Sequence, residues 1–114
     1  SLLLQGVCQA RGGNLGSAEK TLLSAYEMDA GNPAIAMNLA EVLYRRADYE
    51  RARFYVRRVN NQAELRNAES LWLAARVERK LGNDSGVREL GNQLRERYPK
   101  SREASAFERG AFDD

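Results

Sequence analysis

The stretch GVCQARGGNLGSAEKTLLSA, residues 6–25, contains the pattern that decides the fold of this chain. It places a small residue on each side of the turn signal Gly13-Asn14, followed by larger apolar residues at helical spacing. The pattern recurs 34 residues later in AEVLYRRADYERARFYVRRV, residues 40–59. It recurs again, after a spacing of 35, in ARVERKLGNDSGVRELGNQL, residues 75–94. One residue is therefore added between the second and third copies, in the connection at 60–64.

Small residues, a breaking turn and an apolar stripe at this period are typical of the tetratricopeptide repeat, which the chain resembles. Each such repeat is a helix–turn–helix unit that buries its apolar face by stacking on its neighbours. The resemblance implies an all-α superhelix with repeats at about 1–32, 33–65 and 66–99 and a short capping helix within 100–110. We expect a single domain. Because the chain starts at Ser1 without Met and directly in a helix, we also expect it to be a fragment of a longer protein.

Helical spacing of the apolar residues predicts where each helix lies and which residues form the core. The expected helices span 1–12, 15–29, 33–46, 49–60, 66–81 and 84–97, with a short last helix at about 101–109. Small residues should allow close helix crossings at Gly6, Ala18, Ala40, Ala52 and Ala75. The expected core residues are Leu2, Leu22, Leu43, Val56, Val59, Leu71, Leu90 and Leu94.

The ends of the chain carry three further expectations. Cys8 should be a small buried side chain of the first helix. Ala104 and Phe107 should cover the exposed face of the last repeat, as a terminal cap does. Beyond Gly110 the chain should fray.

Composition limits the classes of function. Charged residues make up 30% of the chain and the aliphatic residues are amphipathically spaced, so it is neither disordered nor membrane-spanning. The formal net charge of +2 is too small to predict nucleic acid as a partner, although 15 of the 18 basic residues are arginines. The arginines within 45–58 spread around their helices among acidic residues. Nucleic acid is therefore a poor second choice, whereas a partner or membrane surface with negative charge stays open.

Signals of catalysis are nearly absent. The chain has no histidine, the commonest general base and the commonest metal ligand. The glycine-rich residues 12–17 are not a phosphate-binding loop, because no Lys follows the second glycine directly and no strand precedes them. We therefore predict a protein that is not an enzyme, with no catalytic residue, no metal site and no cofactor.

The register of the repeats predicts a concave groove for a protein partner, lined mainly by the first helix of each repeat. Aromatic side chains surrounded by arginines suit an extended or helical peptide with hydrophobic anchors and some acidic groups. The alternative is that Trp72 packs between repeats and that the arginines only keep the surface soluble. The predicted groove residues are Arg11, Met37, Asn38, Glu41, Tyr44, Arg45, Trp72, Arg76 and Arg79.

Several stretches resemble a narrower group of repeat proteins. These are NPAIAMNLAEVLY at 32–44, DYERAR at 48–53, ESLWLAAR at 69–76 and QLRERYPKS at 93–101. In this order, and followed by a short cap, they are similar to the last repeats of the type IV pilus biogenesis pilotins, the PilF/PilW family.

The resemblance implies a binding protein that helps the type IV pilus secretin to reach the outer membrane and assemble there, and so supports twitching motility. It also implies a place on the periplasmic face of the outer membrane, held by a lipid anchor upstream of Ser1 and absent from this fragment, which would itself be soluble. Two alternatives are a generic tetratricopeptide scaffold or adaptor in another envelope or cytoplasmic complex, and the regulatory repeat domain of an enzyme.

Overall fold

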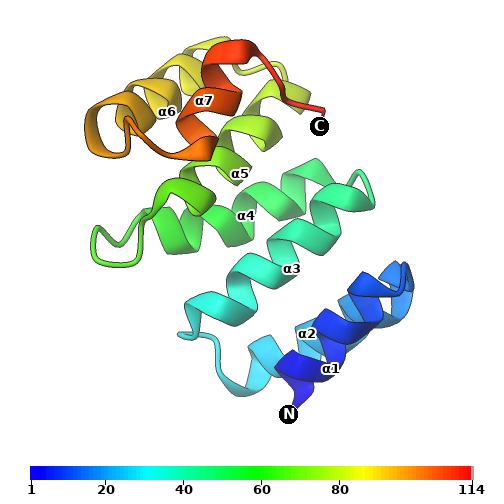
Figure 1. The fold of residues 1–114 in the computed structure, drawn as a ribbon. Coiled ribbons are helices and arrows are strands. Elements are labelled where there is room, and N and C mark those ends of the chain that lie inside the picture. Colours follow the sequence, from blue (N-terminus) through cyan, green and yellow to red (C-terminus); the bar gives the residue numbers. More distant parts are fainter. Residues whose placement is uncertain (114) are drawn as a thin grey trace. The chain divides into compact units, whose positions relative to one another are not determined.

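A computed structural model describes residues 1–113, which contain seven α-helices and no strand (Figure 1). The expected all-α fold is confirmed, and every predicted helix end lies within two residues of the observed one. The helices are α1 (Leu2–Arg11), α2 (Leu15–Met28), α3 (Pro33–Arg45), α4 (Tyr49–Asn60), α5 (Ala68–Lys80), α6 (Asp84–Arg97) and α7 (Arg102–Arg109).

The helices fall into two compact units, each of which is described by itself. Unit 1 is Ser1–Val59, with α1, α2, α3 and nearly all of α4. Unit 2 starts at Asn60 and contains α5, α6 and α7. The expected single domain and the expected repeat boundaries stay predictions.

The turn inside each repeat has the same hydrogen-bond pattern. In the first turn the N–H groups of Gly13 and Asn14 donate to carbonyl groups near the end of α1, at 3.0 and 2.9 Å. The same pair of bonds recurs in the second and third turns. This is the Schellman motif, which needs one residue in the left-handed conformation. That residue is Gly13 in the first turn (φ 82°), Ala47 in the second (φ 62°) and Gly82 in the third (φ 76°).

Ala47 therefore carries a Cβ where the other two turns have glycine. The left-handed conformation costs an L-residue such as alanine about 1–2 kcal/mol. Glycine avoids this cost, but the greater freedom of its unfolded chain lowers stability by roughly 0.5–1 kcal/mol, which is the smaller effect. We expect Ala47→Gly to raise the free energy of unfolding by up to about 1 kcal/mol in urea denaturation. Ala34→Gly, at an exposed position in the first turn of α3, should lower it. Destabilisation of equal size at both positions would contradict this account.

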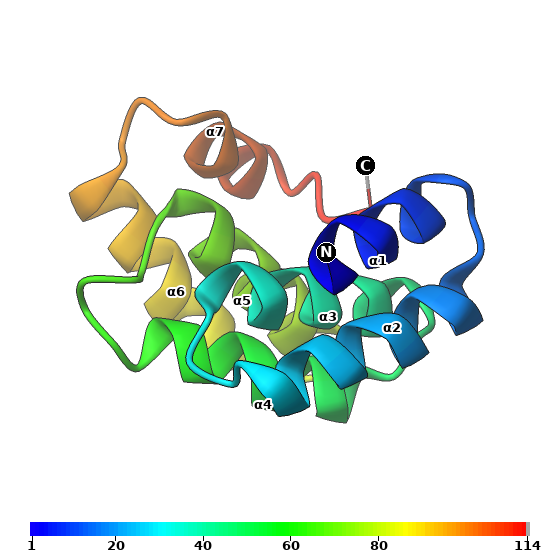
Figure 2. The same ribbon diagram turned by 90° about the horizontal axis from the view of Figure 1, so that it is seen from below.

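The close helix crossing predicted at Gly6 is confirmed. A Cβ built on Gly6 would lie 2.6 Å from the side chain of Leu22, so α1 and α2 approach each other to a distance that only glycine allows without movement. Figure 2 shows these two helices side by side. The other four small residues are also buried. They are Ala18, Ala40, Ala52 and Ala75.

In unit 2, α7 packs against both α5 and α6 (Figures 1 and 2). Ala104 of α7 is buried with Leu71 and Leu94, and Phe107 packs against this cluster. Gly91 of α6 leaves room for the Phe107 ring, which a Cβ at that position would overlap. The expectation that Ala104 and Phe107 cap the last helix pair is confirmed.

Two expectations differ from the structure. Six of the eight predicted core residues are buried, but Leu2 and Leu90 are only half-buried. Cys8 is exposed, because two residues turn a helix by about 200°, which places Cys8 opposite the buried Gly6. Fraying of residues 111–113 stays a prediction. The N–H of Ala111 donates to a carbonyl of α7 at 2.9 Å.

Candidate functional site

Six of the predicted groove residues lie in unit 1, on the first helices of two neighbouring repeats. Helices α1 and α3 are in contact, and the guanidinium of Arg45 donates to the carbonyl oxygen of Ala10 at 3.1 Å. This bond brings Arg45 beside Arg11, the next residue of α1. We call the six predicted groove residues of unit 1 the α1–α3 surface. They are Arg11, Met37, Asn38, Glu41, Tyr44 and Arg45.

The α1–α3 surface combines half-buried side chains with exposed arginines. Arg11 and Arg45 are exposed, whereas the other four are half-buried. The Asn38 amide donates to the carbonyl of Ala34 in its own helix at 2.8 Å. The Tyr44 ring meets the edge of Tyr49, with ring centroids 5.6 Å apart. The surface thus combines partly accessible Met37 and Tyr44 with two exposed arginines, a composition that suits a peptide with apolar and acidic groups.

The remaining three predicted groove residues lie in unit 2, on α5, and we call them the α5 surface: Trp72, Arg76 and Arg79. The guanidinium carbon of Arg76 lies 5.4 Å from the centroid of the Trp72 ring. Such a contact stabilises by about 0.5–1 kcal/mol at an exposed site. Arg79 lies over a different ring, that of Phe112, at 4.6 Å.

Phe112 is a residue of the site that sequence reasoning missed. Its ring centroid lies 5.1 Å from that of Trp72 and 5.6 Å from that of Phe107, and Trp72 and Phe107 are 6.4 Å apart. The chain reaches this position through Gly110, which has φ 68° and ends α7 in a further Schellman motif. In such a motif the residue that packs back is the one directly after the glycine, which here is Ala111, so the motif gave no signal for Phe112.

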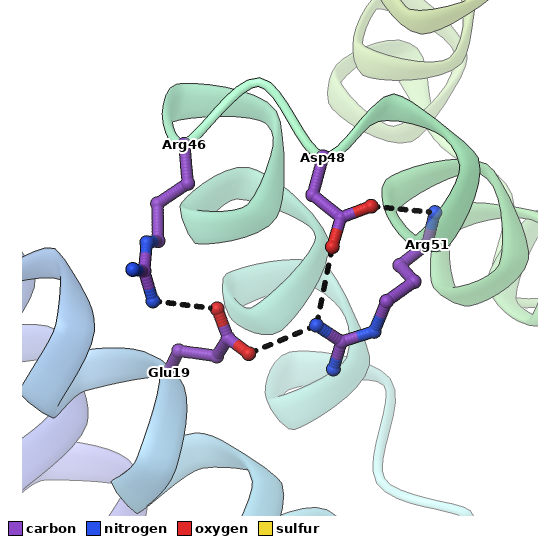
Figure 3. A network of polar contacts seen from close by, with 4 residues as sticks. All are labelled: Glu19, Arg46, Asp48 and Arg51. Carbon is purple, nitrogen blue, oxygen red and sulfur yellow. Dashed lines mark hydrogen bonds and ion pairs between the residues drawn. The ribbon is translucent and has the colours of Figure 1, made fainter.

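The arginine-rich segment within 45–58 is engaged with nearby acidic groups. Figure 3 shows Glu19 of α2 between Arg46, at 2.8 Å, and Arg51 of α4, at 2.9 Å. Asp48 also pairs with Arg51, at 3.2 Å. The hydrogen bond that Arg51 donates to the Glu19 carboxylate raises the pKa of Arg51 above its ordinary value, so this guanidinium stays charged. The network ties α2 to the turn between α3 and α4, which gives these arginines a structural role that their spacing did not reveal.

Two other kinds of site are absent from residues 1–113. No helix in that range combines the length and the apolar character that crossing a bilayer requires. The same residues contain no group of three or more Cys, Asp or Glu side chains placed to hold a metal ion.

Two solved structures of pilus proteins are similar to this chain. The crystal structure of PilW, described as a widely conserved type IV pilus biogenesis factor, superposes with a TM-score of 0.84 at 26% identity, over 92% of this chain and 48% of PilW. The structure of Pseudomonas aeruginosa PilF gives 0.75 at 24% identity, over 92% and 47%, and supports the fold alone. The chain thus spans about half the length of each. The similarity to PilF and PilW that the sequence indicated is confirmed.

A comparison with curated protein sequences found no match. The sequence profile described as "Tetratricopeptide repeat" matches residues 9–66, slightly more than half of the chain. The matched range contains two of the three Schellman turns and the close approach of α2 to Arg46 and Arg51. Sequence profile and helical architecture agree, and the chain belongs to the tetratricopeptide repeat family.

Proposed function

We propose that this chain is a non-enzymatic protein-interaction module of type IV pilus biogenesis. The observation that carries the proposal is the similarity to PilW over 92% of the chain, with a TM-score of 0.84. Tetratricopeptide repeats stack into extended surfaces that bind other proteins, and this fold needs no cofactor for that work. In this proposal, the exposed Arg11 and Arg45 and the half-buried Met37 and Tyr44 contact the partner.

The partner in this proposal is the type IV pilus secretin, and the role is that of a pilotin. The protein would hold a segment of the secretin at the periplasmic face of the outer membrane while the secretin assembles. In the α1–α3 surface, Met37 and Tyr44 would anchor apolar side chains, and Arg11 and Arg45 would attract acidic ones.

Binding of purified secretin to the immobilised chain tests the proposal. We expect retention of the detergent-solubilised secretin by the chain in biolayer interferometry, and none of an unrelated outer-membrane protein in the same detergent. Absence of secretin binding at micromolar concentrations would contradict the pilotin role. Capture of both proteins to the same extent would show non-specific adhesion and contradict it equally.

Variants of the α1–α3 surface should weaken secretin binding in two distinguishable ways. Tyr44→Ala should raise Kd about fivefold or more at any salt concentration, because truncating an anchor loses about 1 kcal/mol or more. Arg11→Glu should raise Kd most at low salt, because screening acts over about 8–10 Å at ordinary ionic strength. Arg88→Glu, the same charge change at an exposed position on α6, serves as the control. Wild-type affinity in both surface variants, with unchanged thermal melting, would exclude this surface.

A further inference from the structure

We infer that the α5 surface is a binding site for a peptide segment in which an acidic residue follows an aromatic one, and that residues 110–113 of this chain occupy the site in cis. The inference rests on the proposed function as a protein-interaction module, and it names the partner chemistry for one of its surfaces.

The ring of Phe112 is held on several sides. Its centroid lies 5.1 Å from that of Trp72, with an interplanar angle of 40°, and 5.6 Å from that of Phe107, with an interplanar angle of 64°. The guanidinium of Arg79 lies 4.6 Å from its centroid. Trp72 is in turn covered by Arg76 at 5.4 Å. Arg79 and two rings thus form a seat for the Phe112 side chain, and arginine and aromatic residues are typical of interaction hot spots.

The residue after Phe112 forms an ion pair with α5. Asp113 pairs with Lys80 at 3.4 Å, and Lys80 follows Arg79 directly at the end of α5. Lys80 therefore supplies a positive charge to the acidic residue that follows the Phe112 ring. Both partners of the pair are well exposed, with side-chain exposures of 40% for Lys80 and 74% for Asp113. Such a pair adds little affinity, so the ring contacts carry most of the binding and the acidic group mainly selects orientation.

Residues 111–113 can leave this seat without unfolding α7. Helix α7 is held by its own residues, the buried Ala104 and the Phe107 ring against Gly91. Beyond Gly110, the backbone bond of Ala111 back to α7 is made at the helix end and does not involve α5. The contacts of this segment with α5 are those of the Phe112 ring and one exposed ion pair, so a partner segment of the same chemistry can replace it.

Residues 110–113 compete with such a partner for the α5 surface and so lower its apparent affinity. A tether of a few residues gives an effective concentration in the millimolar range, so a free peptide binds the occupied site weakly. Removing the Phe112 ring should open the site to the same peptide added in trans.

The test is a titration of fluorescein-labelled Arg-Gly-Ala-Phe-Asp, the sequence of residues 109–113, with the full chain. We expect the Phe112→Ala variant to bind the peptide at least about tenfold more tightly than the wild type does. Versions of the peptide with Ala for Phe or Asn for Asp should bind more weakly. Phe54→Ala, which removes an exposed phenylalanine from unit 1, should bind the peptide as the wild type does.

Trp72 gives a second readout because it is the single tryptophan of the chain. Its emission should shift to longer wavelength in Phe112→Ala, and the added peptide should reverse the shift. Arg79→Ala, which keeps the ring but removes its cation, should shift the emission in the same direction by less. If Phe112→Ala loses helical signal, the Arg79→Ala variant still tests the inference.

Unchanged Trp72 emission in the folded variants would overturn the inference, as would equal binding of the Ala-substituted peptide. Failure here would leave secretin binding through the α1–α3 surface intact. Peptide binding without secretin binding would instead keep this site and reject the proposed partner.

Discussion

Leu94→Ala is expected to lower the free energy of unfolding by about 2–5 kcal/mol. Leu94 of α6 is fully buried, with 0% exposure, and shares one cluster with Leu71 of α5 and Ala104 of α7. It therefore contacts the point at which all three helices of unit 2 meet. Shortening it leaves a cavity that these helices cannot close without losing their own contacts. Urea denaturation followed by circular dichroism measures the loss.

The matched control is Leu4→Ala in α1. The Leu4 side chain is 63% exposed, so its removal should change the free energy of unfolding by less than about 0.5 kcal/mol. A similar loss at positions 4 and 94 would mean that the packing of unit 2 is not as described.

Gly91→Ala is expected to destabilise the protein by about 1–3 kcal/mol, although alanine has the higher helix propensity. In an open helical position, alanine would be favoured over glycine by about 0.5–1 kcal/mol. At position 91, however, the new Cβ would overlap the ring of Phe107, which must then move away from α6. Because Phe107 also contacts Trp72, the emission of Trp72 should change together with stability.

Gly16→Ala is the control for this second prediction. A Cβ at position 16 in α2 would meet nothing nearer than an Arg46 nitrogen at 3.9 Å. This substitution should therefore stabilise by about 0.5–1 kcal/mol, the opposite sign. Stabilisation by both substitutions would show that Phe107 does not occupy the space above Gly91.

Most of the secondary structure followed from local sequence signals. The largest difference, two residues at the start of the fifth helix, arose where such a signal was weak. The fifth helix was expected from residue 66 but begins at Ala68. Asn67 caps it, since its side chain accepts the N–H of Ser70 at 2.8 Å and the Ser70 hydroxyl accepts the N–H of Asn67 at 2.9 Å. Ser takes the place that Glu or Gln has in the usual capping box, so the signal was weaker than the apolar pattern around it.

The candidate site was less accessible to sequence reasoning. The repeat register placed nine side chains on the first helices of their repeats, and their role in binding stays a prediction. It did not show that Trp72 and Arg79 meet Phe112, because that contact joins residues 33 or more positions apart across three helices. It also did not show that Glu19 serves two arginines at once.

The sequence by itself determined the helices, the turns between them and the close crossing at Gly6, because these depend on backbone conformation and on residue size repeated at a constant period. Only the tertiary structure decided which side of α1 leaves Cys8 exposed and which surface Phe112 covers. Those outcomes depend on the neighbours that each face acquires, and a single ring or ion pair of about 1 kcal/mol leaves no periodic trace in the sequence.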